Sequence, residues 1–174
     1  MKVFVGLGNP GIEYANTRHN AGILCVEYLA QLPVHQSPYG WRRHKQAYVY
    51  ETPALTLAKT AGKFMNESGV WVRELLKNIP NPILYLVHDD LDIRLGEYKI
   101  QKGVGPKIHN GILSVEQALG VTDFYRVRIG IDNRESENRI PGEQYVLQKF
   151  AAEELTILQP VFKALSDELH NEIT

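Results

Sequence analysis

A strand that runs into a glycine-rich turn opens the chain and constrains the fold of the segments after it. Residues 3–5 are Val, Phe and Val, a run that favours a buried β-strand. The glycines at positions 6, 8 and 11 end that strand, and the turn exposes the polar stretch after it. We expect this turn to present Asn9, and His19 to lie at the edge of a cleft.

The same three glycines match the spacing G-x-G-x-x-G of dinucleotide-binding folds. That fingerprint needs a helix at the third glycine, whereas residues 12–20 are mostly polar and have no helical apolar repeat. The acidic residue expected about 20 positions further on would be Glu27, which lies inside an apolar helical pattern. The context therefore disfavours a nucleotide fold.

Length and composition indicate one globular domain. The chain has 174 residues, 44% of them hydrophobic, so we expect a single domain over residues 1–174. A net charge of −1 means that a nucleic-acid partner must be met by a local basic patch. Cys25 is the only cysteine, which excludes an intramolecular disulfide and favours a reducing compartment. No apolar run approaches the roughly 18 residues of a membrane helix, so we expect a cytoplasmic protein without membrane contact.

Strand-like and helical patterns alternate along the chain. We expect further strands at residues 46–51, 54–59, 83–87, 95–102 and 125–131, a strand or turn at 146–150, and helices at 21–32, 70–79, 112–119 and from 151 onward. The most continuous apolar run, 83–87, favours a central parallel strand whose end delivers His88, Asp89 and Asp90. The alternation predicts an α/β fold, a mixed and mostly parallel sheet with helices on both faces.

Polar side chains with related chemistry recur in turns, at predicted helix starts and at strand ends. They are Asn9, His19, Asn66, Asp89, His109 and Asn110. If they converge, a carboxylate on one imidazole nitrogen fixes the tautomer, and the other nitrogen can take a proton from water. Amides can hold a carbonyl and the oxyanion that it becomes. Since no G-x-S-x-G elbow is present, the pattern favours hydrolysis by activated water.

A metal site is the main competing chemistry. The possible ligands are His19, His88, Asp89, Asp90 and His109. No H-x-x-x-H pair or comparable ligand spacing appears, so we expect no metal. The simplest alternatives make His88 a strand-end residue, Asp90 and Asp92 loop or cap residues, and Asn66 a helix N-cap.

Five motifs resemble those of bacterial-type peptidyl-tRNA hydrolase, in the right order over nearly the whole chain. They are Val5-Gly-Leu-Gly-Asn-Pro-Gly11 with Tyr14 and Thr17-Arg-His-Asn20, Phe64-Met-Asn-Glu-Ser-Gly69, His88-Asp-Asp-Leu-Asp92, His109-Asn-Gly111 and Arg126-Val-Arg-Ile-Gly-Ile131. Each motif is weak alone, but the ordered set is specific. The resemblance implies a cytoplasmic, monomeric, cofactor-free ester hydrolase that releases the peptide from peptidyl-tRNA dropped by ribosomes and so recycles the tRNA.

The resemblance also implies roles for residues. His19 would be the general base, Asp89 its orienting partner, and Asn9 a catalytic amide that polarises the carbonyl. The residues expected to contact the substrate are Tyr14, Phe64, Met65, Asn66, His109 and Asn110. The family grips the tRNA 5′ phosphate with an arginine and a lysine, which Arg128 and Lys102 would supply.

One loop departs from the family pattern. Gly103-Val-Gly-Pro-Lys-Ile108 stands where the family usually has a glycine-rich loop ending in two glycines. Pro106 stiffens this approach to His109, which puts loop gating and the placing of Asn110 in question. Two other functions stay open: an RNA-binding protein on the same fold without turnover, and a small-ester hydrolase without an RNA partner.

Overall fold

The computed structural model describes residues 1–137 and 139–171. Residue 138 and residues 172–174 lie outside the described residues. Residues 172–174 are the last three of the domain expected over 1–174. The strands are β1 (Lys2–Gly6), β2 (Arg42–His44), β3 (Ala47–Glu51), β4 (Leu55–Thr60), β5 (Ile83–Arg94), β6 (Tyr98–Lys102) and β7 (Tyr125–Asp132). They form one seven-stranded sheet in the order β2-β3-β4-β1-β5-β7-β6. The central strands β4, β1, β5 and β7 are parallel, and antiparallel pairs flank them, which confirms the expected mixed sheet.

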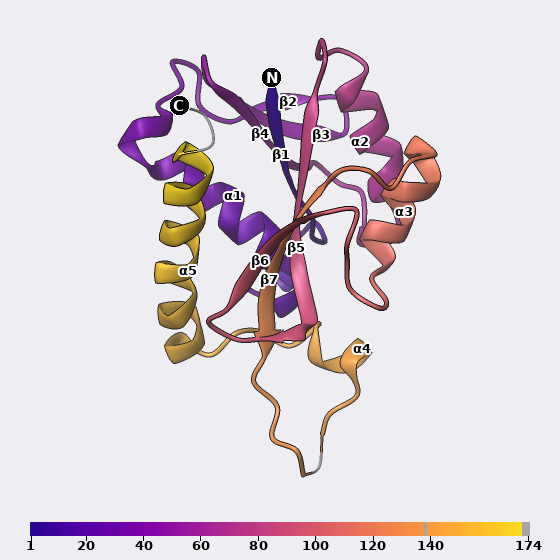
Figure 1. Ribbon diagram of the computed structural model, residues 1–174, viewed down its shortest axis with the longest axis vertical. Helices are drawn as coiled ribbons and strands as arrows, with labels where there is room; N and C mark the ends of the chain where they lie inside the picture. The colour runs from indigo at the N-terminus through magenta and orange to yellow at the C-terminus, as the bar shows by residue number, and fades with distance from the viewer. Residues whose placement is uncertain (138, 172–174) are drawn as a thin grey trace.

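Helices cover both faces of the sheet, as the sequence predicts (Figure 1). The helices are α1 (Ala21–Gln31), α2 (Ser68–Leu76), α3 (Asn110–Leu119), α4 (Gly142–Tyr145) and α5 (Ala152–Asn171), with 3-10 turns η1 (Ile12–Tyr14), η2 (Arg18–Asn20), η3 (Pro33–His35) and η4 (Met65–Glu67). Helices α1 and α5 lie on one face, and α2 and α3 on the other. Residues 146–150 contribute only a single bridge, between Thr17 and Lys149, and are otherwise turn.

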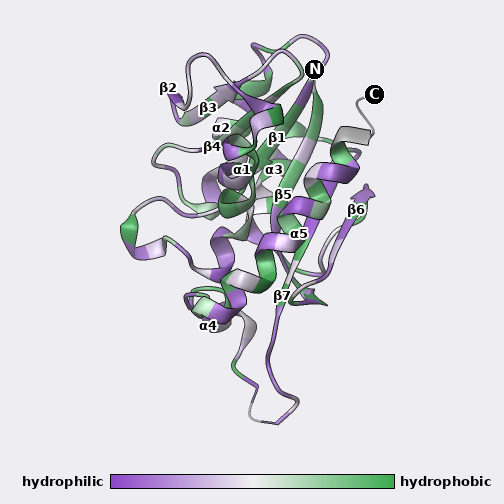
Figure 2. Cartoon of the chain, turned by 90° about the vertical axis from the view of Figure 1, so that its left-hand side faces the viewer, coloured by the Kyte–Doolittle hydropathy of each residue, from purple (hydrophilic) through white to green (hydrophobic). Residues whose placement is uncertain are grey.

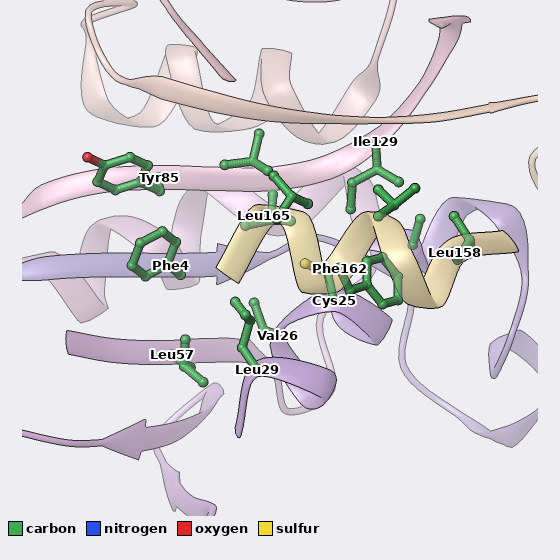
Figure 3. Packing of buried hydrophobic residues seen from close by; sticks show 14 of the residues in the cluster. Phe4, Cys25, Val26, Leu29, Leu57, Tyr85, Ile129, Leu158, Phe162 and Leu165 are labelled. Atoms are coloured by element: carbon green, nitrogen blue, oxygen red, sulfur yellow. The ribbon is translucent and has the colours of Figure 1, made fainter. Parts of the chain in front are cut away.

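Side chains of the central strands alternate between two hydrophobic cores. Phe4 of β1 points to the α1 and α5 side, where it packs with Val26, Leu165 and the stacked ring of Tyr85 (Figure 3). The neighbouring residues of β1 point to the α2 and α3 side, toward Trp71. Burial on both faces explains why β1 and the first half of β5 are apolar, whereas the edge strand β2 is hydrophilic (Figure 2).

Strand β5 is longer than the apolar run from which it was predicted. Pairing with β1 stops at Gly6 and Val87, but β7 continues to pair with β5 as far as Asp90 and, after an irregularity, again at Arg94. His88, Asp89 and Asp90 therefore lie within β5, not after it, because β7 supplies hydrogen bonds beyond the end of β1. Beyond the end of β1, the carboxyl ends of β5 and β7 form an open edge of the sheet. The segments that carry the functional side chains lie at this edge.

The start of α1 is pressed against this edge. A side chain at Gly22 would bring its Cβ within 2.1 Å of the carbonyl oxygen of Val87, so only glycine allows the approach. Helix α3 starts at the same edge from the opposite face, with His109 as its N-cap. Across the described residues, none of the helices is both long and apolar enough to span a membrane.

Candidate active site

His19 and Asp89 form the centre of the site. The turn η2 is fixed by backbone hydrogen bonds, in which the His19 N–H donates to Val146 at 2.7 Å. The His19 Nδ1 lies 2.9 Å from Oδ2 and 3.0 Å from Oδ1 of Asp89. The carboxylate side chain is 2% exposed and that of His19 is 13% exposed. Asp89 therefore accepts a hydrogen bond from the Nδ1–H group and so keeps the ring proton on Nδ1. The lone pair of Nε2 is then available to accept a proton from water.

His109 contacts the same carboxylate from the other face of the sheet. Its Nε2 lies 2.8 Å from Oδ1 of Asp89. Its Nδ1 accepts from the backbone N–H groups of Gly111 and Ile112, at 3.2 Å and 3.3 Å, and so caps α3. Since Nδ1 is an acceptor, the ring proton must be on Nε2, where it is donated to Asp89. His109 thus orients Asp89, a role beyond lining the crevice.

The charges of this cluster reinforce one another. Burial lowers the pKa of His19, but the charge of Asp89 and the hydrogen bond to it raise that pKa above its ordinary value. Burial acts in the opposite sense on Asp89, yet His19 and His109 hold the pKa of its carboxyl well below the usual range. Asp89 therefore stays ionised and stabilises an imidazolium at His19, which is what a general base needs after it takes a proton.

His88 lies behind His109 and is fully buried. Its ring is 5.1 Å from the His109 ring, and its Nδ1 donates to the carbonyl oxygen of Asp89 at 2.8 Å. Burial lowers the pKa of His88 to about 3, with His109 as a further cause. His88 is therefore a neutral, buried part of the cluster, which corrects its interpretation as a strand-end residue.

The amide of Asn9 is oriented by two neighbours. Its Oδ1 accepts from the Met65 N–H at 2.8 Å, which fixes which end of the amide is the oxygen and which is the nitrogen. The Asn20 side chain binds the Asn9 backbone twice, accepting from N–H at 2.8 Å and donating to C=O at 3.0 Å. Sequence reasoning assigned no role to Asn20, although it belongs to the motif that contains His19.

The expected substrate-contacting residues lie in η1, in and beside η4, and at the start of α3. Phe64 is 43% exposed and meets Tyr14 edge to face, with 5.8 Å between ring centroids. Met65 is buried, so it acts on the site through its backbone bond to Asn9. Asn66 is exposed and caps no helix, because the N-cap of α2 is Glu67. Asn110 is exposed at the first position of α3, beside His109.

The two residues expected to hold an RNA phosphate are not brought together. Arg128 is 8% exposed; its Nε donates to Asp90 at 2.7 Å and its Nη1 to Gln101 at 2.6 Å. Lys102 pairs with Asp123 at 3.0 Å, and in the register between β6 and β7 it faces Tyr125. Because side chains alternate along a strand, Lys102 points to the α5 face and Arg128 to the α3 face.

Another lysine lies opposite Arg128 in that register. Lys99 pairs directly with Arg128 across β6 and β7 and is exposed. Asp90, expected in a loop or cap, is instead a buried residue of β5 that compensates the charge of Arg128. The opposite charges of Asp90 and Arg128 were the only feature of the sequence that could suggest this ion pair. No local pattern links two positions that are 38 residues apart.

Of the possible metal ligands, three come together. His19, Asp89 and His109 place one ligand atom each within 4.8 Å of the others, whereas Asp90 pairs with Arg128 and His88 with a backbone carbonyl. The proton positions deduced for His19 and His109 place an N–H toward Asp89 in both cases. This arrangement fits hydrogen-bonded imidazoles around a carboxylate.

The loop that departs from the family pattern reaches the site through its last residues. The Lys107 N–H donates to Oδ2 of Asp92 at 3.1 Å, which ties the loop to the end of β5. Ile108 is next in the chain, with 86% of its surface exposed, beside the His109 cap. Directly after this loop, His109 is the N-cap of α3 and Asn110 is its first residue.

Comparisons with known proteins agree with this geometry. The family model described as Peptidyl-tRNA hydrolase matches residues 3–174. A peptidyl-tRNA hydrolase of Desulfotalea psychrophila is 34% identical, over 94% of this chain and 86% of the relative, and one of Paracoccus denitrificans is 38% identical, over 96% and 71%. The crystal structure of peptidyl-tRNA hydrolase from Acinetobacter baumannii superposes with a TM-score of 0.77 at 29% identity, covering 98% of this chain and 87% of that one. The chain therefore belongs to the peptidyl-tRNA hydrolase family.

Proposed function

We propose that this chain hydrolyses the ester bond between peptide and tRNA by general-base attack of water. Nε2 of His19 takes a proton from a water molecule while its oxygen attacks the ester carbonyl carbon. The Nδ2 group of Asn9 donates to the carbonyl oxygen as that oxygen gains negative charge. When the intermediate collapses, the ribose oxygen of the tRNA leaves with the proton held by His19, which restores the base.

The orientation of His19 by Asp89 carries this proposal. The buried carboxylate fixes the tautomer, and the charge that it retains stabilises the protonated ring. Asn9 is held with its amide nitrogen free, as a carbonyl-binding group requires. Asn66 and Asn110, both exposed, supply further amides for the peptide and the terminal nucleotide.

The RNA side of the substrate would meet the α3 face of β6 and β7. Arg128 is part of this proposal, and Lys99, exposed directly opposite it, supplies a second positive charge for a phosphate. Lys102 can contact RNA only from the α5 face, separately from Arg128. The expected monomer in the cytoplasm, without a cofactor, belongs to the same proposal.

An RNA-binding protein without turnover is the alternative function. Such a protein would not need an amide and a base held in a buried hydrogen-bond network, and this chain has both. The complete network therefore favours turnover over binding alone.

The test is release of an N-acetylated aminoacyl group from tRNA, with unblocked aminoacyl-tRNA alongside. We expect the parent chain to release only the blocked group, and His19→Ala to be slower by about 10²–10⁴-fold, the usual contribution of a general base. The matched control is His44→Ala on the exposed strand β2, which should leave the rate unchanged. Salt-dependent tRNA binding without release by the parent chain would support the binding-protein alternative.

A further inference from the structure

Arg18 comes directly before His19 in the turn η2, yet its side chain contacts a different part of the molecule. The Arg18 side chain is 9% exposed, and its Nη1 donates to Oε2 of Glu154 at 2.9 Å. Glu154 lies in the first turn of α5, 136 residues further along the chain. Because a buried charge without a partner is strongly unfavourable, this ion pair links η2 to α5.

The guanidinium of Arg18 also lies against two aromatic rings. It is 4.2 Å from the centroid of the Tyr145 ring and 5.2 Å from that of Phe150. The Tyr145 hydroxyl donates to the carbonyl oxygen of Ile131 at 3.0 Å, which anchors this ring to β7. Arg18 is therefore held in part by a ring that is itself fixed to the sheet.

The Glu154 carboxylate has other donors besides Arg18. Its Oε2 accepts from the Ala151 N–H at 2.8 Å, and its Oε1 accepts from Nδ2 of Asn133 at 3.3 Å. Burial raises the pKa of this carboxyl, but the Ala151 N–H and Arg18 lower that pKa below its ordinary value, so Glu154 is ionised. The partner of Arg18 is thus an anion that is fixed at the start of α5.

The backbone of η2 is bonded to the segment between α4 and α5. The Arg18 N–H donates to Gln148 at 2.9 Å, and the His19 N–H donates to Val146 at 2.7 Å. Since η2 is a turn of three residues, a displacement of Arg18 is passed directly to His19. The His19 ring must keep its Nδ1 within hydrogen-bond distance of Asp89, and a misplacement of about 1 Å at an active site can lower a rate by about 10²-fold.

We propose that the buried ion pair between Arg18 and Glu154 is a positioning contact, which holds the His19 imidazole against Asp89. The inference rests on the proposed function, because it takes His19 as the general base. Without the ion pair, η2 would keep its backbone hydrogen bonds but lose its side-chain link to α5. The contact between His19 and Asp89 would then loosen, which would weaken both the orientation of the base and the stabilisation of its protonated ring.

The test compares Arg18→Met with Arg18→Lys by the pH profiles of kcat and KM for N-acetylaminoacyl-tRNA. Methionine fills the space beside the aromatic rings without a charge, whereas lysine keeps a positive charge for Glu154. We expect Arg18→Met to lower kcat by about 10–100-fold with a smaller change in KM, and Arg18→Lys to recover part of that loss. The acid limb of the kcat/KM profile should move to lower pH in Arg18→Met, because Asp89 then raises the pKa of His19 less against the lowering effect of burial.

The direction of this pH shift separates positioning from a loss of stability. A less stable variant unfolds more readily in acid, which would move the acid limb to higher pH, opposite to the shift expected here. Among the described residues, Asp89 and His109 are the titratable groups that contact the His19 ring, and both are unchanged in these variants. Thermal unfolding of each variant shows whether it is folded at the assay temperature.

The matched control is Arg134→Met. Arg134 also lies over the Tyr145 ring, 5.0 Å from its centroid, but its ion pair is with Asp132 and not with Glu154. This variant loses a cation beside the same ring and leaves the link between η2 and α5 intact. It should keep the parental kcat and the parental acid limb.

If Arg18→Met does not fold, Glu154→Gln removes the charge from the α5 side of the pair and is measured in the same way. A folded Arg18→Met with the parental kcat and acid limb would overturn the proposal. Equal losses in Arg18→Met and Arg18→Lys, or in Arg18→Met and Arg134→Met, would also overturn it. Failure of the proposed function gives a different result, because the parent chain would then release no acetylaminoacyl group.

Discussion

The side chain of Asn20 forms hydrogen bonds with both backbone polar atoms of Asn9. The donor and the acceptor of one amide are thus used on a single residue, at 3.0 Å and 2.8 Å, in a buried setting. Together with the bond from Met65, these contacts fix the Asn9 backbone and side chain. Asn20 is thereby a positioning residue for the group that we assign to the carbonyl oxygen.

Removal of that support should act on the chemical step. We expect Asn20→Ala to lower kcat by about 10–100-fold with a smaller change in KM, because a misplaced donor loses transition-state stabilisation. Asn20→Asp should lie between the parent and Asn20→Ala, since it keeps the acceptor for the Asn9 N–H and loses the donor. Steady-state kinetics decides this. The control Asn78→Ala removes an exposed amide, and equal losses in both variants would contradict the assignment.

Asp89→Asn tests the orientation and the charge of the carboxylate. The rate should fall by about 10²–10⁴-fold, because an amide can hold the wrong tautomer and cannot stabilise the imidazolium. In the parent, Asp89 raises the pKa of His19 against the lowering effect of burial. Without that charge the pKa falls, so the acid limb of the kcat/KM profile should move to lower pH. If the acid limb of Asp89→Asn stayed at the parental pH, Asp89 would not control the pKa of His19. The control is Asp123→Asn, which alters an exposed carboxylate.

His88 should make folding stability depend on pH. Its pKa is about 3 in the folded protein, whereas an unfolded histidine titrates near 6.5. Between these values the unfolded chain binds the extra proton, so the free energy of unfolding should fall by up to about 1.4 kcal/mol for each pH unit of acidification. Denaturant titrations of His88→Asn should show a shallower dependence in this window. His44→Asn, which alters an exposed histidine, should retain the parental slope.

The exposed lysines distinguish the two faces of the RNA contact. We expect Lys99→Ala to weaken tRNA binding and reduce the slope of log K against log salt by about one, as loss of a phosphate contact does. Lys102→Ala should change that slope less, because Lys102 faces α5 and pairs with Asp123. Filter binding at several salt concentrations measures both. Arg128→Ala is less informative, since it would leave Asp90 buried without its partner.

The elements were predictable where one face or both faces of a segment are apolar. The run 83–87 identified the central strand, and His109 and Gly120 marked the two ends of α3. The alternation along β6 already places Lys102 on the face of Tyr98 and Ile100, opposite to Lys99. Which of these faces Arg128 shares was not predictable, because only the register between β6 and β7 shows it.

The ordered motifs named the candidate site residues, but they did not reveal how these residues are connected. Asp90 reads as a loop residue because its compensating charge, Arg128, comes from another strand. Likewise, no local pattern indicates that His109 shares the carboxylate with His19. Such links arise from tertiary packing, which brings separate segments to one edge of the sheet.

The carboxylate of Asp89, which both His19 and His109 contact, also has a consequence for the order of folding. Asp89 is 70 residues from His19 and 20 from His109, and the helices that follow the two histidines, α1 and α3, lie on opposite faces of the sheet. Both layers must dock before the base is oriented, and contacts so distant in sequence form late relative to local ones. During refolding, recovery of hydrolysis should therefore trail recovery of helical signal. The recovery of enzymatic activity therefore reports the time at which both helical layers have docked on the sheet.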